Sequence, residues 1–369
     1  MKCKKLIDCC EFISDGDHLP PPKSRDGIPF ITISNITGQN KISFEDTMFV
    51  PKSYYDKLSE TKIARKGDIL YSVVGSFGKP VYVDFKRAIV FQRHIAILRP
   101  KSEVNGKYLY YTMLNPQFYR MVDKLAIGCS QRTVTLDTLR NIEINLPDKD
   151  IQDKIVGVLS LIDEKIDINN NVNDNLEQQI KTIFTFQFLQ NANTEWKQQS
   201  LAELSKMYQP KTISGKDLIA DGNYFVYGAN GIIGKYNQYN HSESEIAVAC
   251  RGASCGSIQM TLPFSWITGN AMVVRPHSDF PYKEYLYYYL LAKNPNYLCS
   301  GSAQPQLTRE NLTLYSLKVP PITELNVFES YAEKVRKIII KNQQENIELS
   351  TLRDWLLPML MNGQATISD

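Results

Sequence analysis

Two groups of residues have types and spacings that could carry enzyme chemistry. The first, Pro147-Asp148 with Asp163-Glu164-Lys165, combines the acids and the lysine that a metal-dependent nuclease uses. In a nuclease, such side chains converge on a metal ion from different parts of the fold. Residues 163–165 instead fall between the apolar positions of a predicted helix, so we expect them to point at solvent. The pattern is therefore interpreted as chance, and no nuclease site is predicted.

The second group is similar to the Asn-Pro-Pro-Tyr/Phe loop with which amino-methyltransferases hold a flipped base. Asn115-Pro116-Gln117-Phe118 and Asn294-Pro295-Asn296-Tyr297 both lack the second proline, and both follow predicted short helices rather than a buried strand. The glycines between 228 and 234 do not have the GxGxxG spacing, and no GxxxxGK[ST] phosphate loop is present. We therefore expect no catalytic residue and no cofactor, and any ATP-driven step would belong to a partner.

A metal site is not expected either. The chain has seven cysteines and four histidines, and no two cysteines have the CxxC spacing typical of zinc ligands. Cys9 and Cys10 are adjacent, whereas Cys250 and Cys255 lie five residues apart. We interpret the cysteines as reduced thiols, most of them buried, as in proteins of a reducing compartment.

Polar residues near glycine-containing turns are better candidates for chemistry, namely for contact with nucleic acid. Glycine lets backbone N–H groups approach a phosphate closely. Arginine and glutamine can each make two hydrogen bonds to a base, guanine and adenine respectively. For each residue, a surface salt bridge or a turn hydrogen bond is an alternative role. The candidates are His18, Lys23, Arg25, Ser76, Lys79, Arg93, Gln131 and Arg132 in the first part of the chain, and Asn230, Arg251, Ser254, Asn270, Gln304, Gln306 and Arg309 in the second.

The composition favours a folded protein of more than one domain. The chain has 369 residues, of which 43% are hydrophobic and 22% charged, values typical of globular proteins but a length beyond one ordinary domain. The net charge is only +3, yet residues 1–150 hold 23 Lys and Arg against 17 Asp and Glu. A basic segment is compatible with contact to nucleic acid. Because neither a signal peptide nor a long apolar run is found, we expect a cytoplasmic protein.

The elements that would position these candidates occur twice in the sequence. GCSQRTVTLDTL at 128–139 and GSAQPQLTRENL at 301–312 share Gly, Gln, Thr, an acid and Leu at the same relative positions. The register persists upstream, where YLYYTML matches YLYYYLL, GDILYSVVGSFG matches SEIAVACRGASCG, and IPFITISNI matches NYFVYGANG. Short apolar runs between Gly, Pro and Asn predict strands, and the tyrosine-rich runs predict short helices. The chain is therefore predicted to contain two copies of one β-rich unit, each followed by a helix.

The helix at the end of each copy is predicted from a coiled-coil pattern. Seam positions between Ile155 and Ile183, and again between Phe328 and Leu356, recur at alternating spacings of four and three residues. A helix of about 35 to 40 residues would span about 50 to 60 Å. That length exceeds the distance of about 34 Å between successive turns of a DNA duplex, so two domains spaced by such helices could reach separate DNA segments.

Two asparagines occupy seam positions near the middle of each predicted helix. A polar residue at such a position costs stability and fixes the register of the pair. Alternatively, the asparagines lie on the surface and Ile168 and Val172 carry the seam. The short link at 188–195 favours antiparallel packing of the two helices. In that arrangement we expect Asn169 to lie near Asn346 and Asn173 to lie near Asn342.

Over essentially its whole length the chain resembles the specificity subunits of type I restriction-modification systems. The resemblance rests on KLIDCCEFISDGDHLPPPKSRDGIPFITISNI, YFVYGANGIIG and GSAQPQLTRENL, and on the proline that precedes each predicted long helix. It implies an α+β fold with two pseudo-symmetric, β-rich globular recognition domains, separated by two long helices that pack as an antiparallel coiled coil. The implied boundaries are 1–148 and 192–320 for the recognition domains, and 149–191 and 321–369 for the spacer helices.

The resemblance also implies a function. A specificity subunit has no catalytic activity of its own, reads a bipartite site in double-stranded DNA, and holds two methyltransferase subunits to which restriction-translocase subunits can be added. Because the two recognition domains differ in sequence, the two half-sites should differ as well. Two other classes remain as alternatives: a self-contained DNA methyltransferase or nuclease, and a coiled-coil scaffold without a role in DNA binding.

Overall fold

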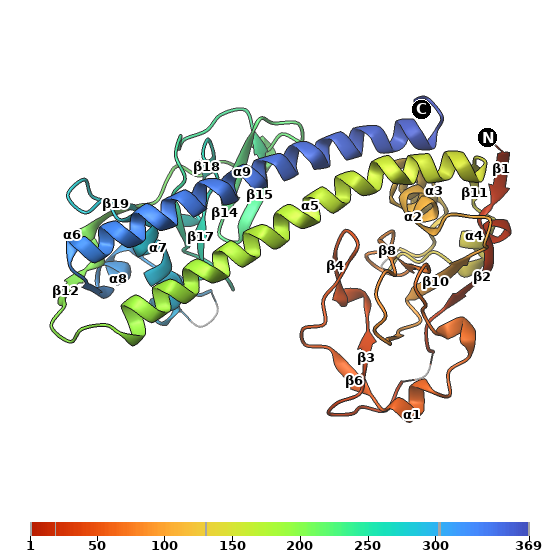
Figure 1. Cartoon of the computed structure of the whole chain (residues 1–369), viewed down its shortest axis with the longest axis horizontal. Coiled ribbons are helices and arrows are strands. Elements are labelled where there is room, and N and C mark those ends of the chain that lie inside the picture. The colour runs from red at the N-terminus through yellow and green to blue at the C-terminus, as the bar shows by residue number, and fades with distance from the viewer. Residues whose placement is uncertain (1, 19, 130, 302–303, 368–369) are drawn as a thin grey trace. The chain divides into compact units, whose positions relative to one another are not determined.

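The chain forms two compact units, seen in a computed structural model that describes residues 2–18, 20–129, 131–301 and 304–367 (Figure 1). Unit 1 comprises Met1–Asp167 together with Asn346–Asp369, and unit 2 comprises Ile168–Glu345. The boundary between the units falls inside both long helices. Each unit therefore consists of one β-rich part and a portion of each long helix.

A four-stranded antiparallel sheet forms the centre of each unit. Its order is β2-β10-β7-β8 in unit 1 and β13-β19-β16-β17 in unit 2, so the two sheets share one topology. Residues 95–98 of β10 and 271–274 of β19 are completely buried, as expected for central strands packed on both faces. The strands are β2 (Cys10–Asp15), β7 (Ile69–Ser72), β8 (Pro80–Tyr82), β10 (Ile95–Pro100), β13 (Ser205–Tyr208), β16 (Ile246–Ala249), β17 (Ile258–Met260) and β19 (Ala271–Pro276).

Two smaller sheets repeat in the same way. A three-stranded sheet has one antiparallel and one parallel pair, in the order β6-β3-β9 in unit 1 and β15-β14-β18 in unit 2. An antiparallel pair, β1-β11 or β12-β20, precedes each long helix, and unit 1 adds the pair β4-β5. The strands are β1 (Lys2–Lys5), β3 (Ile28–Ile31), β4 (Ile36–Gly38), β5 (Lys41–Ile42), β6 (Met48–Val50), β9 (Val90–Phe91), β11 (Glu143–Leu146), β12 (Lys197–Ser200), β14 (Tyr224–Gly228), β15 (Gly231–Tyr236), β18 (Trp266–Ile267) and β20 (Ser316–Val319).

The tyrosine-rich runs form helices, as predicted, and each shares a core with the central sheet and the long helices of its unit. α2 (Gly106–Leu114) begins at Asn105, whose side chain accepts hydrogen bonds from two backbone N–H groups. α7 (Lys283–Ala292) has no such cap of its own, and the Glu329 carboxylate accepts its first N–H groups instead. The shorter helices are α1 (Lys52–Tyr55), α3 (Pro116–Leu125), α4 (Leu136–Asn141), α6 (Leu201–Leu204), α8 (Arg309–Thr313), η1 (Leu6–Cys9), η2 (Ile33–Asn35), η3 (Glu60–Lys62), η5 (Gly215–Asp217) and η6 (Pro295–Leu298).

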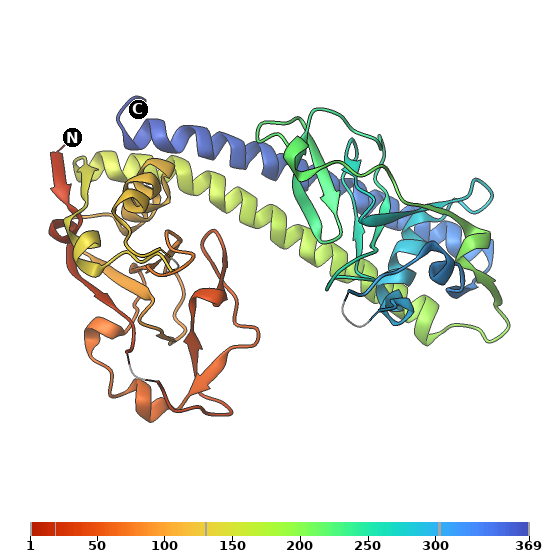
Figure 2. The ribbon, with the colours of Figure 1, turned by 180° about the vertical axis from the view of Figure 1, so that it is seen from behind.

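The two long helices are antiparallel, as predicted. They are α5 (Lys149–Phe184), which continues as the π-helix η4 (Thr185–Gln190), and α9 (Ile322–Met361). Partners on α9 have decreasing numbers as those on α5 increase: Asp163 pairs with Arg353 in unit 1, whereas Asn173 pairs with Asn342 and Glu177 with Arg336 in unit 2. Figure 2 shows α5 and α9 side by side within each unit.

The burial of the asparagines decides between the two interpretations of the α5 seam. Asn169 is 3% exposed and Asn173 is 8% exposed, whereas Ile168 is 55% and Val172 is 40% exposed. The asparagines therefore lie in the seam, and the interpretation that places them on the surface is wrong.

The predicted pairing across the seam is confirmed for one pair of asparagines. The side-chain amide of Asn342 donates to Oδ1 of Asn173 at 2.9 Å. Asn169 donates to the carboxylate of Glu345, the residue before Asn346, also at 2.9 Å. The closeness of Asn169 to Asn346 itself stays a prediction.

The prediction that residues 163–165 point at solvent is wrong for Asp163, whose carboxylate is bonded to other side chains. It accepts a hydrogen bond from the Tyr111 hydroxyl at 2.7 Å and is ion-paired with Arg353 at 3.0 Å. The guanidinium of Arg353 is nearly buried at a seam position, so it needs a counter-charge there. The side chain of Glu164, the next residue, is 62% exposed, as expected.

The prediction that all cysteines are reduced thiols is wrong for one pair. Cys255 and Cys299 form a disulfide although they are 44 residues apart in sequence. The fold brings their Cα atoms to 6.5 Å, and no local sequence pattern reveals this proximity. The other five cysteines are free. Of these, Cys9, Cys10 and Cys250 are buried, whereas Cys3 and Cys129 are exposed.

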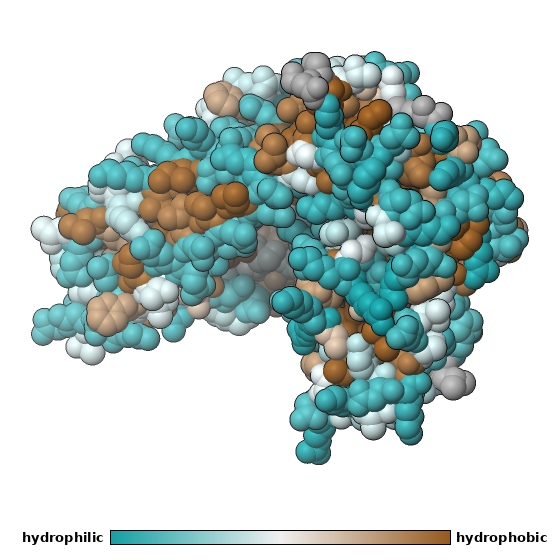
Figure 3. Space-filling view, turned by 45° about the vertical axis from the view of Figure 1, so that its right-hand side comes forward, coloured by the Kyte–Doolittle hydropathy of each residue, from teal (hydrophilic) through white to brown (hydrophobic). Residues whose placement is uncertain are grey.

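The exterior is mixed in polarity. Figure 3 shows mostly hydrophilic residues on one face of each unit, interrupted by patches of hydrophobic residues. Some exposed hydrophobic residues lie on the long helices, including Leu161 of α5 and Trp355 of α9. Within the described ranges, no helix has both the length and the apolar character needed to span a membrane.

Candidate nucleic-acid interface

Three segments that are distant in sequence meet at one end of the central sheet of unit 1. They are the loop after β7, the turn before β10 and the loop at 127–134. Val73 donates its backbone N–H to the carbonyl of His94 at 2.9 Å and accepts one from Val134 at 2.8 Å. Gly75 donates to the carbonyl of Arg132 at 2.9 Å. These bonds fix the backbone from which several of the predicted contact residues project.

Unit 2 builds the same frame from the equivalent segments. Cys250 donates to the carbonyl of Asn270 at 2.9 Å and accepts from Leu307 at 2.9 Å, and Gly252 donates to the carbonyl of Pro305 at 3.1 Å. Each of these bonds has its counterpart in unit 1. We refer to each set of three segments, in the residues that the structure describes, as the loop frame of its unit: residues 73–79, 92–94, 127–129 and 131–134 in unit 1, and residues 250–257, 268–270, 300–301 and 304–307 in unit 2.

The glycines and threonines shared by the two repeated phrases have structural roles in the loop frames. Gly128 and Gly301 have φ values of 96° and 94°, a region that other residues rarely adopt. A Cβ at either glycine would lie within 3 Å of a backbone carbonyl oxygen three residues ahead. Thr135 and Thr308 cap α4 and α8 with their hydroxyl oxygens. The shared glycines and threonines therefore build the loop, and the polar residues between them, which include Gln131 and Gln304, remain candidates for contact.

In unit 1 the frame brings together Arg93 and Gln131, two residues predicted as DNA contacts. Both are exposed and line one surface hollow, together with Asp15 and His94. Partial burial, and then the charge of Arg93, lower the pKa of His94. Its imidazole is therefore neutral at pH 7, with one donor and one acceptor nitrogen. Ser76 and Lys79, on the loop after β7, are also exposed.

Arg132 is held within the frame rather than free at its edge. Its guanidinium is ion-paired with Asp123, donates to the Asp123 carbonyl, and lies 5.6 Å from the centre of the Phe77 ring. These contacts connect the 127–134 loop to α3 and to the loop after β7. Arg132 therefore positions the loop frame, and the neighbouring Gln131 is the better candidate for a base contact.

The three remaining candidates of unit 1 lie between β2 and β3. His18 is exposed and bonded to Asp15 at 2.7 Å, so it reaches a residue that lines the hollow. Lys23 and Arg25 are exposed on either side of Ser24, whose N–H donates to the carbonyl of Phe49 in β6. The structure does not place them in the loop frame.

In unit 2 the frame collects five of the predicted residues. The backbone of Arg251 pairs with that of Gln306, and the carbonyl of Asn270 accepts the N–H of the preceding Cys250. Arg251, Gln304 and Gln306 are exposed, whereas Ser254 and Asn270 are half-buried. Two predicted residues lie elsewhere: Asn230 is in the turn between β14 and β15, and Arg309 is the first residue of α8.

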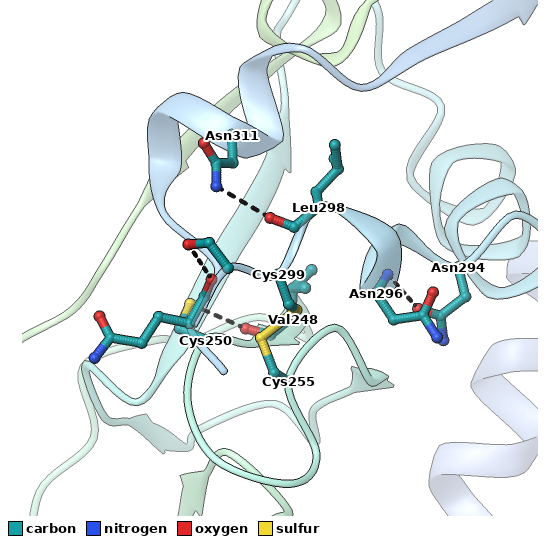
Figure 4. Close-up of a disulfide and its surroundings, with 10 residues drawn as sticks. Val248, Cys250, Cys255, Asn294, Asn296, Leu298, Cys299 and Asn311 are labelled. Carbon is teal, nitrogen blue, oxygen red and sulfur yellow. Dashed lines mark hydrogen bonds between the residues drawn. A yellow bond between two sulfur atoms is a disulfide. The ribbon is translucent and has the colours of Figure 1, made fainter. Parts of the chain in front are cut away.

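The disulfide is a feature of this frame that the sequence did not reveal. Cys255 lies on the loop after β16, and Cys299 lies at the end of η6, just before the 300–307 loop (Figure 4). The bond therefore ties together two segments that carry Arg251 and Gln304. The repeat gave no signal for it, since residues 73–79, the equivalent loop of the first copy, contain no cysteine.

Both Asn-Pro motifs serve as helix caps. The side chain of Asn115 accepts the N–H of Gln117 at 2.9 Å where α3 begins, and Asn294 accepts the N–H of Asn296 at 2.9 Å where η6 begins (Figure 4). Proline is favoured at the first position of a helix because it lacks an N–H. The motifs thus have a structural explanation that involves no flipped base.

Comparison with known proteins identifies the family to which this architecture belongs. The family described as Type I restriction modification DNA specificity domain matches residues 2–178 and again residues 193–350. The chain belongs to this family. It is a specificity subunit with two tandem specificity domains, so neither a self-contained methyltransferase or nuclease nor a scaffold without a DNA role is supported. Specificity subunits are the non-catalytic, DNA-recognising component of type I restriction-modification systems.

Individual relatives agree with this assignment. The specificity subunit of the MjaIX enzyme from Methanocaldococcus jannaschii is 23% identical over an alignment that covers 99% of this chain and 94% of that protein. The HindI specificity subunit from Haemophilus influenzae is 26% identical over 42% of this chain, and the match spans only 36% of that relative. A crystal structure of the type I S subunit from M. genitalium has the same fold, with a TM-score of 0.61 and 18% identity over 100% of this chain and 96% of that one.

Proposed function

We propose that this specificity subunit reads an asymmetric, bipartite site in double-stranded DNA, with one half-site bound by the loop frame of each unit. The observation that carries the proposal is that one backbone frame presents different side chains in the two units. Val74 of unit 1 is replaced by Arg251 in unit 2, His94 by Asn270, and Thr133 by Gln306. Because side chains at base edges determine which bases are bound, the two frames should select different bases.

The residues proposed for base contact are the exposed polar ones of each frame. They are Gln131 and Arg93 of unit 1, and Arg251, Gln304 and Gln306 of unit 2, all of which are exposed. Arginine suits guanine and glutamine suits adenine, because each can form two hydrogen bonds to that base. Ser76, Lys79 and Ser254, which also lie in the loop frames, and Lys23 and Arg25, which lie between β2 and β3, suit phosphate oxygens.

We further propose that the complex contains two methyltransferase subunits. The support is the repeat itself, since each unit combines a loop frame with its own portion of α5 and α9. A duplicated surface offers two equivalent docking places. The mass of the complex with its methyltransferase tests this stoichiometry, and a single bound subunit at saturation contradicts it.

Mapping methylated sites in a cell that carries the complete system tests the recognition proposal. Arg251→Ala and Gln306→Ala should relax base preference in one half-site, each by about 1–3 kcal/mol of discrimination at the contacted position. Gln131→Ala should relax the other half-site. The unaltered half-site of each variant is its internal control. Equal relaxation of both half-sites, or unchanged preference in all three variants, contradicts the assignment of one half-site to each frame.

A further inference from the structure

Each unit contains an ion-pair cluster in the seam between its portions of α5 and α9. In unit 1, Arg353 of α9 lies 3.0 Å from Asp163 of α5, which also accepts a hydrogen bond from Tyr111 of α2. In unit 2, Arg336 of α9 is ion-paired with Glu177 of α5, which accepts a hydrogen bond from Tyr288 of α7 at 2.8 Å. The two clusters thus have the same construction: a tyrosine from the short helix, a carboxylate and an arginine.

The repeat relates these clusters with their charges reversed. Tyr111 and Tyr288 occupy equivalent positions, but Asp163 of the first copy corresponds to Arg336 of the second. Lys107 corresponds likewise to Glu284, which is only 4% exposed in its side chain and lies 3.0 Å from Arg336. Where the first copy contributes a carboxylate from its own helix, the second copy contributes a guanidinium.

Charge reversal matters because the rest of the seam would permit other pairings. Both helices carry asparagines at equivalent seam positions, and both are otherwise mostly apolar there. On these residues alone, α5 could pair with a second copy of α5, and α9 with a second copy of α9. In either pair asparagine would face asparagine and apolar residues would face apolar residues, as they do between α5 and α9.

The charged residues do not permit these like pairings. If α5 of a second chain replaced α9, Asp163 would take the place of Arg336 and would face Glu177. If α9 replaced α5, Arg336 would take the place of Asp163 and would face Arg353. Each like pairing therefore sets like charges together in a largely desolvated seam, where the side chains of Arg336 and Arg353 are 8% and 10% exposed. Such juxtaposition is strongly unfavourable.

We propose that the Asp163–Arg353 and Glu177–Arg336 pairs select pairing of α5 with α9 and exclude pairing of like helices between two copies of the chain. The selection keeps two different loop frames on one pair of helices. It prevents two chains from exchanging helices into a dimer with two identical ends.

Reversing one residue of each pair in the full-length chain, as in the double variant E177R/R353E, tests the proposal. In this variant, pairing of α5 with α9 sets Asp163 against the new carboxylate at position 353, and Arg336 against the new guanidinium at position 177. Both contacts are repulsive. Pairing of like helices sets Asp163 against the guanidinium at position 177 and Arg336 against the carboxylate at position 353, and both contacts are attractive. After refolding from denaturant, light scattering should report twice the molar mass of the wild-type chain.

The double variant E177Q/R353Q is the matched control, because it removes the same two charges without creating attraction between like helices. It should keep the mass of the wild-type monomer. A reversed variant with the control's mass, or a wild-type chain that is itself an exchanged dimer, overturns the proposal. If the reversed variant does not refold, E177R/R353Q retains the attraction between Asp163 and the guanidinium at position 177. A dimer fraction no larger than that of the control then overturns the proposal equally.

Discussion

Several buried polar residues of unit 2 have specific hydrogen-bond partners, and His241 is the clearest case. It is 5% exposed, and its ring nitrogens are bonded to the Tyr208 hydroxyl at 2.9 Å and to the side chain of Asn240 at 2.6 Å. Burial, and then the charge of Arg275, lower the pKa of His241 to about 4. Since an unfolded histidine has a pKa of about 6.5, the folded state requires the neutral ring.

This pKa predicts a loss of stability in mild acid. The stability that depends on the neutral ring of His241 is fully present above pH 6.5. It falls as the pH is lowered from 6.5 towards 4, because the unfolded chain binds the proton more readily than the folded chain. It amounts to about 3 kcal/mol over the whole interval. We expect the free energy of unfolding in urea to fall less between pH 7 and pH 4.5 in His241→Gln than in the wild-type chain. The same slope in both proteins would show that His241 does not carry this dependence.

At the same scale, the sequence predicted where candidate contact residues would lie better than it predicted what each would contact. Gln131, Arg251 and Gln306 were predicted because they are polar residues near glycine-containing turns in segments that the repeat relates. Arg132 was predicted as a contact because its type suits guanine, but Asp123 holds it in place. The identity of a side chain states which bonds it can form, whereas its neighbours in the fold decide which bonds it does form.

At the scale of elements, the seam between α5 and α9 was predictable because its spacing of three and four residues is a local property. Its charged partners were not predictable in the same way. Arg353 occupies a seam position in the pattern, yet its pairing with Asp163 depends on the antiparallel register and on Tyr111 of α2. The disulfide between Cys255 and Cys299 was missed for the same reason, because it joins segments that only the folded unit brings together.

The Asn173–Asn342 bond yields a prediction about these helices. Asn173→Leu should lower the free energy of unfolding by about 1–3 kcal/mol, since the amide of Asn342 loses its acceptor. The double variant N173L/N342L should recover that loss, because two leucines at facing seam positions bury apolar surface and leave no unpaired amide. Urea denaturation of both variants measures the difference. If the double variant were less stable than the single one, the amides would not act as a pair.

At the scale of the whole molecule, the repeat explains why a non-catalytic chain has this form. Two copies of one unit supply two equivalent backbone frames, and the differences between their exposed residues would supply the two proposed base preferences. The shared glycines Gly128 and Gly301 preserve the frames, because few other residue types adopt their backbone conformation. The family and the fold were therefore accessible from the sequence, whereas the bases that each frame reads depend on side-chain positions relative to DNA.

If the two frames read separate half-sites, the length of the helices should set the gap between those half-sites. Inserting four residues into α5 after Asp167, and four into α9 before Asn346, adds about 6 Å to each helix and nearly preserves its phase, because 3.6 residues form one turn. The gap should increase by one or two base pairs, at about 3.4 Å for each, while both half-sites keep their sequences. Methylation mapping of the inserted and wild-type systems measures this change. An altered half-site with an unchanged gap would mean that the long helices themselves contact bases, and the proposed role of the loop frames would then fail.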